Sequence, residues 1–168
     1  MTDPHDILIE VLATYQDAKK WNNQPFENIK RISNTKVGDA GMDFVERYVR
    51  ELGYTCERSA SKQSPWDMKI NEVTFEVKTA SEDVSGCFQF NHIRYHRKYE
   101  ALLCVGVSPA SIYVGAWSKA DVATNKAGTL VSMEKGANAS HKLTKRPAEL
   151  FSAGDLKEPL DGVLKTIR

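Results

Sequence analysis

The chain has only three cysteines among its 168 residues, Cys56, Cys87 and Cys104, and no two of them stand in a C-x-x-C pair. An odd, scattered set argues against a disulfide framework or a zinc knuckle and favours reduced thiols in the cytoplasm. The longest apolar run, from Ala101 to Val107, is far shorter than the roughly 20 residues that a transmembrane helix needs. The acidic start of the chain shows no secretory segment either. We therefore expect a soluble cytoplasmic protein.

The sequence also lacks an excess of charge of one sign, since 23 lysines and arginines stand against 22 acids. The net charge therefore says nothing about an acidic or basic partner. Ten glycines and six prolines are too few for a low-complexity or collagen-like chain. The length fits a single domain over residues 1–168. We expect its core at about 34–117, a helical segment at 1–33, and a basic loop and helix at 118–168.

The spacing of apolar residues predicts the main elements. Helices are expected from a cap at Asp3 to about Ala18, from Asn34 or Thr35 to Leu52, and from about Glu158 onward. Alternating segments predict strands at 54–58, 66–70 and 73–78, and nearly continuous apolar runs predict doubly covered strands at 101–107 and 112–117. With a short helix around His92 and His96, the order predicts an α/β (α+β) fold with a mixed central sheet flanked by helices.

Segments 66–70 and 73–78 are joined by Asn71 and Glu72, which is typical of a β-hairpin. A two-residue turn places Met68 opposite Phe75. One face of the hairpin is then apolar and carries Trp66, Met68, Ile70, Val73, Phe75 and Val77. The other face is polar and carries Asp67, Lys69, Thr74, Glu76 and Lys78.

In this register Asp67 lies opposite Glu76, with β-carbons about 5 Å apart, an unfavourable arrangement unless a positive charge lies between the two carboxylates. Lys78 is one candidate for that charge and a divalent cation is the other. Mg²⁺ prefers one or two carboxylates together with waters and phosphate oxygens. The alternative is a solvated hairpin face on which Lys69 and Lys78 pair with the acids, and the spacing alone does not decide between them.

The sequence Pro-Trp-Asp at 65–67, followed after eight residues by Glu-Val-Lys at 76–78, resembles the motif of the PD-(D/E)XK nuclease superfamily. That superfamily includes type II restriction endonucleases, junction resolvases and repair nucleases. A helix before the hairpin and apolar strands after it also match the family, and the resemblance extends over about residues 34–117. It implies a restriction-endonuclease-like core and Mg²⁺-dependent hydrolysis of DNA, with Mn²⁺ able to replace Mg²⁺.

The resemblance also implies roles for individual residues. Asp67, Glu76 and the backbone carbonyl of Val77 would bind the metal, and Lys78 would assist the attacking water, leaving a 5′ phosphate. Many relatives carry a further glutamate on the first core helix, where this chain has Met42. Glu46 or Asp43 are possible auxiliary residues in its place, so the number of metal ions stays open.

Residues 88–98 contain three cationic residues, two histidines and no acid. Cationic and amide side chains hold phosphates and read base edges, so we expect DNA contacts from this stretch and from two lysines near the motif: Gln89, Asn91, His92, Arg94, Arg97, Lys36 and Lys62. A solvated helix face is the alternative. Residues 119–147 are also basic and form either a flexible arm on the DNA or a solvated loop.

Together these features predict a sequence-specific type II restriction endonuclease that acts on double-stranded DNA. A homodimer is expected, because one chain carries one carboxylate pair and two strands must be cut. A cognate DNA methyltransferase encoded nearby is an expected partner. The alternatives are a structure-specific nuclease, such as a Holliday junction resolvase or repair enzyme, and a catalytically inactive DNA-binding module of the same fold.

Overall fold

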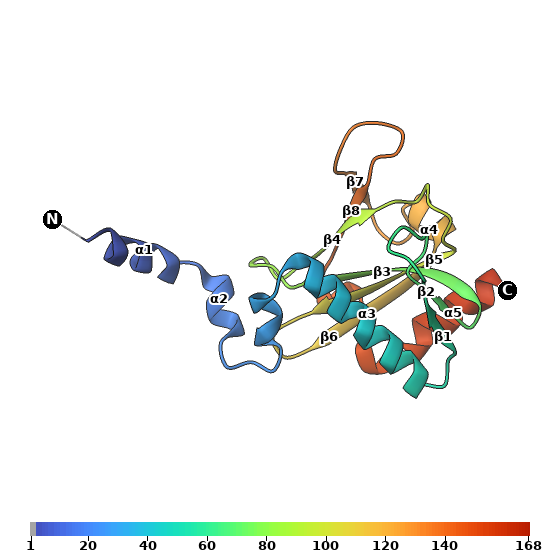
Figure 1. The fold of residues 1–168 in the computed structure, drawn as a ribbon, viewed down its shortest axis with the longest axis horizontal. Helices are drawn as coiled ribbons and strands as arrows, with labels where there is room; N and C mark the ends of the chain where they lie inside the picture. The colour runs from blue at the N-terminus through green and yellow to red at the C-terminus, as the bar shows by residue number, and fades with distance from the viewer. Residues whose placement is uncertain (1–2) are drawn as a thin grey trace.

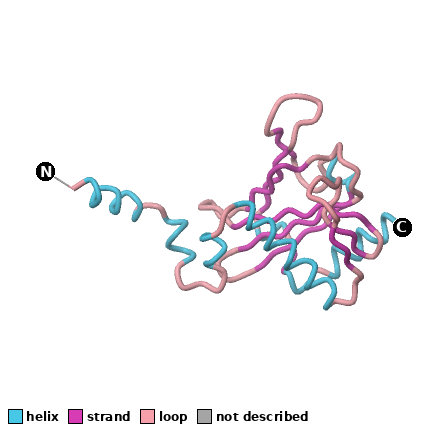
Figure 2. The backbone as a smooth tube through the Cα atoms, viewed as in Figure 1, coloured by secondary structure: helices cyan, strands magenta, loops and turns pink. Residues whose placement is uncertain are grey.

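The computed structural model describes residues 3–168 and is built around a six-stranded mixed sheet with the strand order β1-β2-β3-β5-β6-β9 (Figures 1 and 2). Its strands are β1 (Cys56–Arg58), β2 (Met68–Ile70), β3 (Val73–Ser81), β5 (Ala101–Val107), β6 (Ile112–Ser118) and β9 (Phe151–Ser152). Strands β3 and β5 are parallel, and the other neighbouring pairs are antiparallel. A smaller antiparallel sheet has the order β4-β8-β7, with β4 (Phe88–Ile93), β8 (His141–Lys145) and β7 (Leu130–Ser132).

The two faces of the large sheet have different covers. Helices α3 (Asn34–Glu51) and α5 (Lys157–Ile167) pack on one face, which we call the helix face. The small sheet and α4 (Lys119–Ala123) cover the opposite face, which we call the site face. The short elements are α1 (Pro4–Ala13), α2 (Gln16–Trp21), η1 (Glu27–Arg31), η2 (Pro147–Glu149) and η3 (Ala153–Asp155). The predicted mixed α+β architecture is confirmed.

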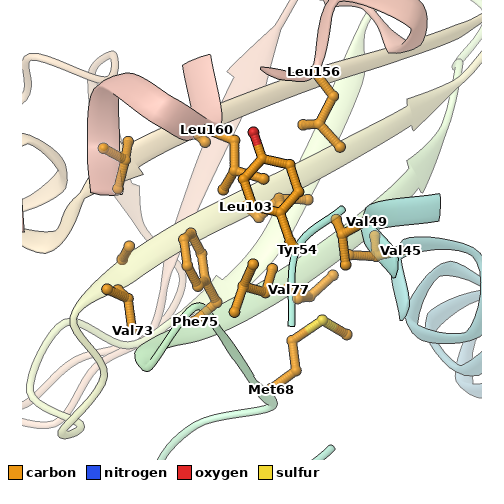
Figure 3. Close-up of a cluster of buried hydrophobic side chains, with 14 of the residues drawn as sticks. Val45, Val49, Tyr54, Met68, Val73, Phe75, Val77, Leu103, Leu156 and Leu160 are labelled. Atoms are coloured by element: carbon orange, nitrogen blue, oxygen red, sulfur yellow. The ribbon is translucent and has the colours of Figure 1, made fainter. Parts of the chain in front are cut away.

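The helix face forms a continuous apolar core. Val45 and Val49 of α3 and Leu160 of α5 meet alternate side chains of β3, including Phe75, around a shared cluster (Figure 3). Their spacing along α3 is the helical repeat that the sequence predicts. Strand β5 is buried on both sides over nearly its whole length, as expected for a central strand.

The hairpin register is confirmed, because Met68 pairs with Phe75 and Ile70 with Val73. Asn71 and Glu72 both have positive φ angles, 45° and 69°, which a two-residue type I′ turn requires. Asn71 also accepts a hydrogen bond from the Thr55 N–H at 2.8 Å, which ties the turn to the chain before β1. The prediction for Trp66 was wrong. Strand β2 begins only at Met68, so Trp66 is half-buried outside the core, with the Lys69 amine 5.3 Å from its ring centre.

Three other expectations need correction. The Asp3 cap is present, but the first helix ends at Ala13 and a second begins at Gln16. The expected short helix around His92 and His96 is absent, because this stretch is strand β4 followed by turns. Residues 119–147 are not one basic loop, since they include α4, β7 and β8 and bury apolar side chains under the site face, and 133–138 form an exposed loop. Within residues 3–168, no helix has the length and apolar character needed to cross a membrane.

Candidate active site

The candidate site lies where the edge of β3 becomes open. Strand β2 pairs with β3 only at Val73–Phe75, while the partner on the other side, β5, accompanies β3 to Ser81. Asp67 lies at the end of the short pairing: its N–H donates to the Phe75 carbonyl at 2.9 Å, and its Oδ2 accepts from the Val77 N–H at 2.8 Å. The turn of the hairpin and the early end of β2 therefore hold the Asp67 carboxylate against the open edge.

Glu76 and Lys78 lie on the site face of β3, because their neighbours in β5, Leu102 and Cys104, belong to the core of that face. Glu76 is only 6% exposed. Its Oε1 lies 3.2 Å from Lys78 Nζ, whereas its Oε2 is buried and has no hydrogen-bond partner. A buried carboxylate oxygen without a hydrogen-bond partner is unfavourable and uncommon in folded proteins.

The charges around Glu76 act in opposite directions on its pKa. Burial is the largest influence and raises the pKa of Glu76, the Lys78 ammonium lowers it, and the nearby Asp67 charge raises it again. The net pKa is raised, so Lys78 alone does not compensate for the buried negative charge. A second positive charge beside Asp67 and Glu76 would stabilise both carboxylates.

The donor atoms at this position suit a hard divalent cation. Carboxylate and carbonyl oxygens are the ligands that Mg²⁺ accepts. Because the N–H and carbonyl of a strand residue point to the same side, the Val77 carbonyl points to the open edge where Asp67 receives the Val77 N–H. The side-chain oxygens that could bind such a cation here are the unpartnered Glu76 Oε2 and the Asp67 carboxylate.

Tyr99 is a neighbour of the site that the sequence did not indicate. It is buried, and its hydroxyl lacks a hydrogen-bond partner. Burial raises the pKa of Tyr99, and the Glu76 charge raises it further, so the phenol stays protonated. Tyr99 lies in the segment between β4 and β5, outside any helix or strand, and no local pattern marks it.

A polar cavity of about 370 Å³ extends from Lys78 along the open edge of β3. It is lined by residues from α3, β3 and β4: Asn34, Val37, Lys78, Thr79, Ala80, Ser81, Gln89, Asn91 and His92. Three of the predicted DNA contacts, Gln89, Asn91 and His92, therefore share one cavity with Lys78. Gln89 is fixed there, since its amide donates to Asp83 Oδ2 at 2.9 Å and accepts from the Thr144 hydroxyl at 2.6 Å.

The other predicted DNA contacts do not line this cavity. Lys36 and Lys62 are exposed, in the first turn of α3 and in the loop between β1 and β2. Arg94 lies 3.8 Å from Glu134, and Arg97 is exposed but close enough for its charge to lower the pKa of Glu76, against the larger effect of burial. These four cations lie at the surface, where a phosphate backbone could reach them.

Asp43 and Glu46 are not brought to the carboxylate pair. Arg58 Nη1 lies 3.0 Å from Asp43 and 3.2 Å from Glu46, and Arg50 also pairs with Glu46 at 2.9 Å. They belong to α3, which packs on the helix face, whereas Glu76 lies on the site face. Among the residues that the structure describes, no group of three or more His, Cys, Asp or Glu side chains is placed to hold a metal ion.

No protein-family model matches the chain, and a search of curated proteins also found no match. Among solved structures, the chain is similar to a bacterial homing endonuclease, I-Ssp6803I, with a TM-score of 0.46 and 10% sequence identity. The alignment covers 68% of this chain and 75% of that one. Similarity at this level identifies neither a shared fold nor a shared activity.

Proposed function

We propose that the chain is a Mg²⁺-dependent endodeoxyribonuclease of the PD-(D/E)XK type, acting as a sequence-specific type II restriction endonuclease. The observation that carries the proposal is the buried Glu76 Oε2, which has no partner although Asp67 and Lys78 lie beside it. Folding leaves this oxygen unsatisfied at an open strand edge. Such an arrangement is typical of a functional site, because stability alone would not select it.

Asp67, Glu76 and the Val77 carbonyl would hold Mg²⁺, or Mn²⁺ in its place. The ion would supply positive charge to the scissile phosphate and lower the pKa of a water molecule. Lys78, whose ammonium is held by Glu76 Oε1, would orient the attacking water and stabilise negative charge on phosphorus. The water oxygen would form a bond to phosphorus as the bond to the 3′ oxygen breaks. The water would lose a proton to solvent and the leaving 3′ oxygen would take one up, which gives a 5′ phosphate and a 3′ hydroxyl.

DNA would bind at the cavity beside Lys78. The amides of Gln89 and Asn91 would contact base edges, while His92, Arg94, Arg97, Lys36 and Lys62 would contact phosphates. Each chain carries one carboxylate pair, so cutting both strands of a duplex calls for a homodimer. A cognate methyltransferase encoded nearby would protect the host's own sites.

Plasmid nicking by Asp67→Asn and Glu76→Gln tests the chemistry. Both substitutions keep the side-chain shape, and Asp67→Asn keeps an acceptor for the Val77 N–H. We expect each to reduce Mg²⁺-dependent cleavage by about 100-fold or more, while DNA binding measured in Ca²⁺ is retained. Glu57→Gln, an exposed acid on β1, is the matched control and should cut like the parent. Near-parental cleavage by either site variant would show that the carboxylate pair is not the active site.

A second candidate is a DNA-binding module that does not cleave. It is favoured by Met42 and by the engagement of Asp43 and Glu46 with Arg58, which leave the site without a third carboxylate. DNA binding without nicking by the parent in Mg²⁺ or Mn²⁺ would select this candidate. If the parent does cut, discrete fragments from linear phage DNA indicate a restriction enzyme, whereas cleavage only at branched junctions indicates a resolvase.

A further inference from the structure

Helix α1 is folded, yet none of its side chains is buried. It projects from the body of the molecule, away from both sheets (Figure 1). Its five large aliphatic residues are between 45% and 64% exposed: Ile7, Leu8, Ile9, Val11 and Leu12. Single exposed apolar residues are common, but five on one ten-residue helix are an unusual concentration, and four of them share one face.

The exposed residues of α1 are arranged for docking. Ile7, Leu8, Val11 and Leu12 have the i, i+1, i+4, i+5 spacing that places them on one continuous face of an α-helix. Asp6 and Glu10, the acids of the helix, lie on the opposite side. The apolar face is therefore free of charge, and the acids would stay in water after the helix had docked.

The same chain contains an open apolar groove, which runs between η1 and α3. Its volume is about 360 Å³, and no residue that lines it is charged. Phe26, Ile29 and Ile32 form the wall on the η1 side, and Val37 and Phe44 form the wall on α3. An amphipathic helix in an apolar groove is a recurrent mode of recognition.

We propose that α1 of one copy occupies this groove in a second copy, and that the exchange is reciprocal. The end of α2 is tied to the body of the molecule, since Trp21 is buried and the neighbouring Lys20 pairs with Glu82 at 2.9 Å. From this anchored α2, α1 continues outward (Figure 1). Exchange of an identical element between protomers is a low-cost route to a dimer.

The exchange would cover two apolar helix faces and two grooves at once, and each helix would contribute four side chains, Ile7, Leu8, Val11 and Leu12. The proposal is independent of nuclease activity, since neither α1 nor the groove contains Asp67, Glu76 or Lys78.

Sedimentation velocity tests the role of the helix. We expect the parent to be a dimer and the double variant Leu8→Asp, Leu12→Asp to be a monomer with an unchanged circular dichroism spectrum, because both side chains are more than half exposed in the single chain. The matched control, Asp6→Asn with Glu10→Gln, should stay dimeric. A parent that is monomeric at every concentration would overturn the proposal, and so would a Leu8→Asp, Leu12→Asp variant that remains dimeric.

Complementation tests whether helix and groove meet. Ile32→Asp changes a groove residue that is 38% exposed, so the fold should tolerate it, and we expect this variant to be monomeric. Mixing it with the Leu8→Asp, Leu12→Asp variant should restore a dimer, because Ile32→Asp supplies an intact α1 and the other variant supplies an intact groove. Absence of the mixed dimer, as expected if α1 paired with α1 instead, would refute the exchange. Ile29→Asp, in the same wall, repeats the test should Ile32→Asp fail to fold.

Discussion

The two faces of β3 differ sharply, although they alternate along one strand of nine residues. Val73, Phe75 and Val77 enter the apolar core of the helix face, where they join a cluster of buried hydrophobic side chains (Figure 3). Glu76 and Lys78 enter the site face, where a carboxylate oxygen is buried without a partner. One face of the strand is packed for stability, and the other holds polar groups, among which Glu76 Oε2 has no hydrogen-bond partner.

Glu76 on the site face contrasts with Asp83, a carboxylate in the loop between β3 and β4. Burial alone would raise the pKa of Asp83, but hydrogen bonds from Gln89, Ser85 and Cys87 outweigh it and lower the pKa to about 2. Glu76 has one lysine and an orphaned oxygen, and burial raises its pKa. Under the proposed function, Asp83 is a structural acid, whereas Glu76 is the acid that would bind the metal ion.

The largest effect on stability is expected from Phe75→Ala on the helix face. Phe75 is fully buried, and truncation would leave a cavity among apolar neighbours. We expect a loss of about 3–5 kcal/mol in the free energy of unfolding, measured by urea denaturation. A loss no larger than that of the site-face variants below would remove the contrast between the faces.

Lys78→Met should have the next largest effect, because it removes the cation paired with the buried Glu76. In EDTA at pH 8, we expect a loss of about 1–3 kcal/mol. Mg²⁺ or Mn²⁺ should then raise the melting temperature of this variant more than that of the parent, since a bound ligand stabilises the folded state.

Lys69→Met is the matched control for Lys78→Met, because Lys69 shares the polar side of the hairpin but pairs 3.9 Å away with an exposed acid, Glu57. Its effect should stay within about 0.5 kcal/mol. Equal losses in the two lysine variants, or no response to metal in either, would indicate an ordinary solvated hairpin face.

The difference in stability between the parent and Glu76→Gln should depend on pH. Because the folded-state pKa of Glu76 is raised above the usual 4.5, the folded protein holds this proton more tightly than the unfolded chain does. The stability of the parent should therefore fall as pH rises from 4.5 through the raised pKa, and Glu76→Gln should lack this part of the fall. Urea denaturation in EDTA should show the variant more stable than the parent by about 1 kcal/mol at pH 8 and similar to it near pH 4.5. A parent at least as stable as the variant at pH 8 would contradict the raised pKa.

Asp83→Asn should change the stability in the opposite sense. Because the pKa of Asp83 is lowered to about 2, its contribution to stability is complete above the usual 3.8 and is lost as pH falls through about 2. We expect the variant to lose about 1 kcal/mol at pH 7 and to converge with the parent near pH 2, measured by thermal unfolding. Ser85→Ala, which removes one of the donors, should cost less. A variant more stable than the parent at pH 7 would refute the structural role.

Much of the fold was predictable because its signals are local. The apolar stripe of α3, the alternation of β3 and the apolar run of β5 each follow from residues within one element. The hairpin register followed from a two-residue turn, and it was enough to place Met68 opposite Phe75. The same register predicted that Asp67 and Glu76 lie close together, and the structure puts the Asp67 carboxylate on the N–H of the residue after Glu76.

The errors came from contacts between distant segments. The end of strand β4 near His92 was mistaken for a helix because its partner, β8, is far along the chain; the Gln89–Thr144 hydrogen bond joins residues 55 positions apart. Asp43 and Glu46 were predicted as auxiliary site residues, but Arg58, on β1, forms ion pairs with both. A single segment carries no signal of such partners.

The sequence by itself therefore determined the mixed sheet, the hairpin and the face of β3 that carries Glu76 and Lys78, because side-chain periodicity is a property of neighbouring residues. Only the tertiary structure decided what surrounds that face: the early end of β2, the cavity shared with β4, and the buried Tyr99 hydroxyl. It also decided that α1 is left without a covering surface. Burial and missing partners depend on how distant segments pack together, and no local pattern encodes them.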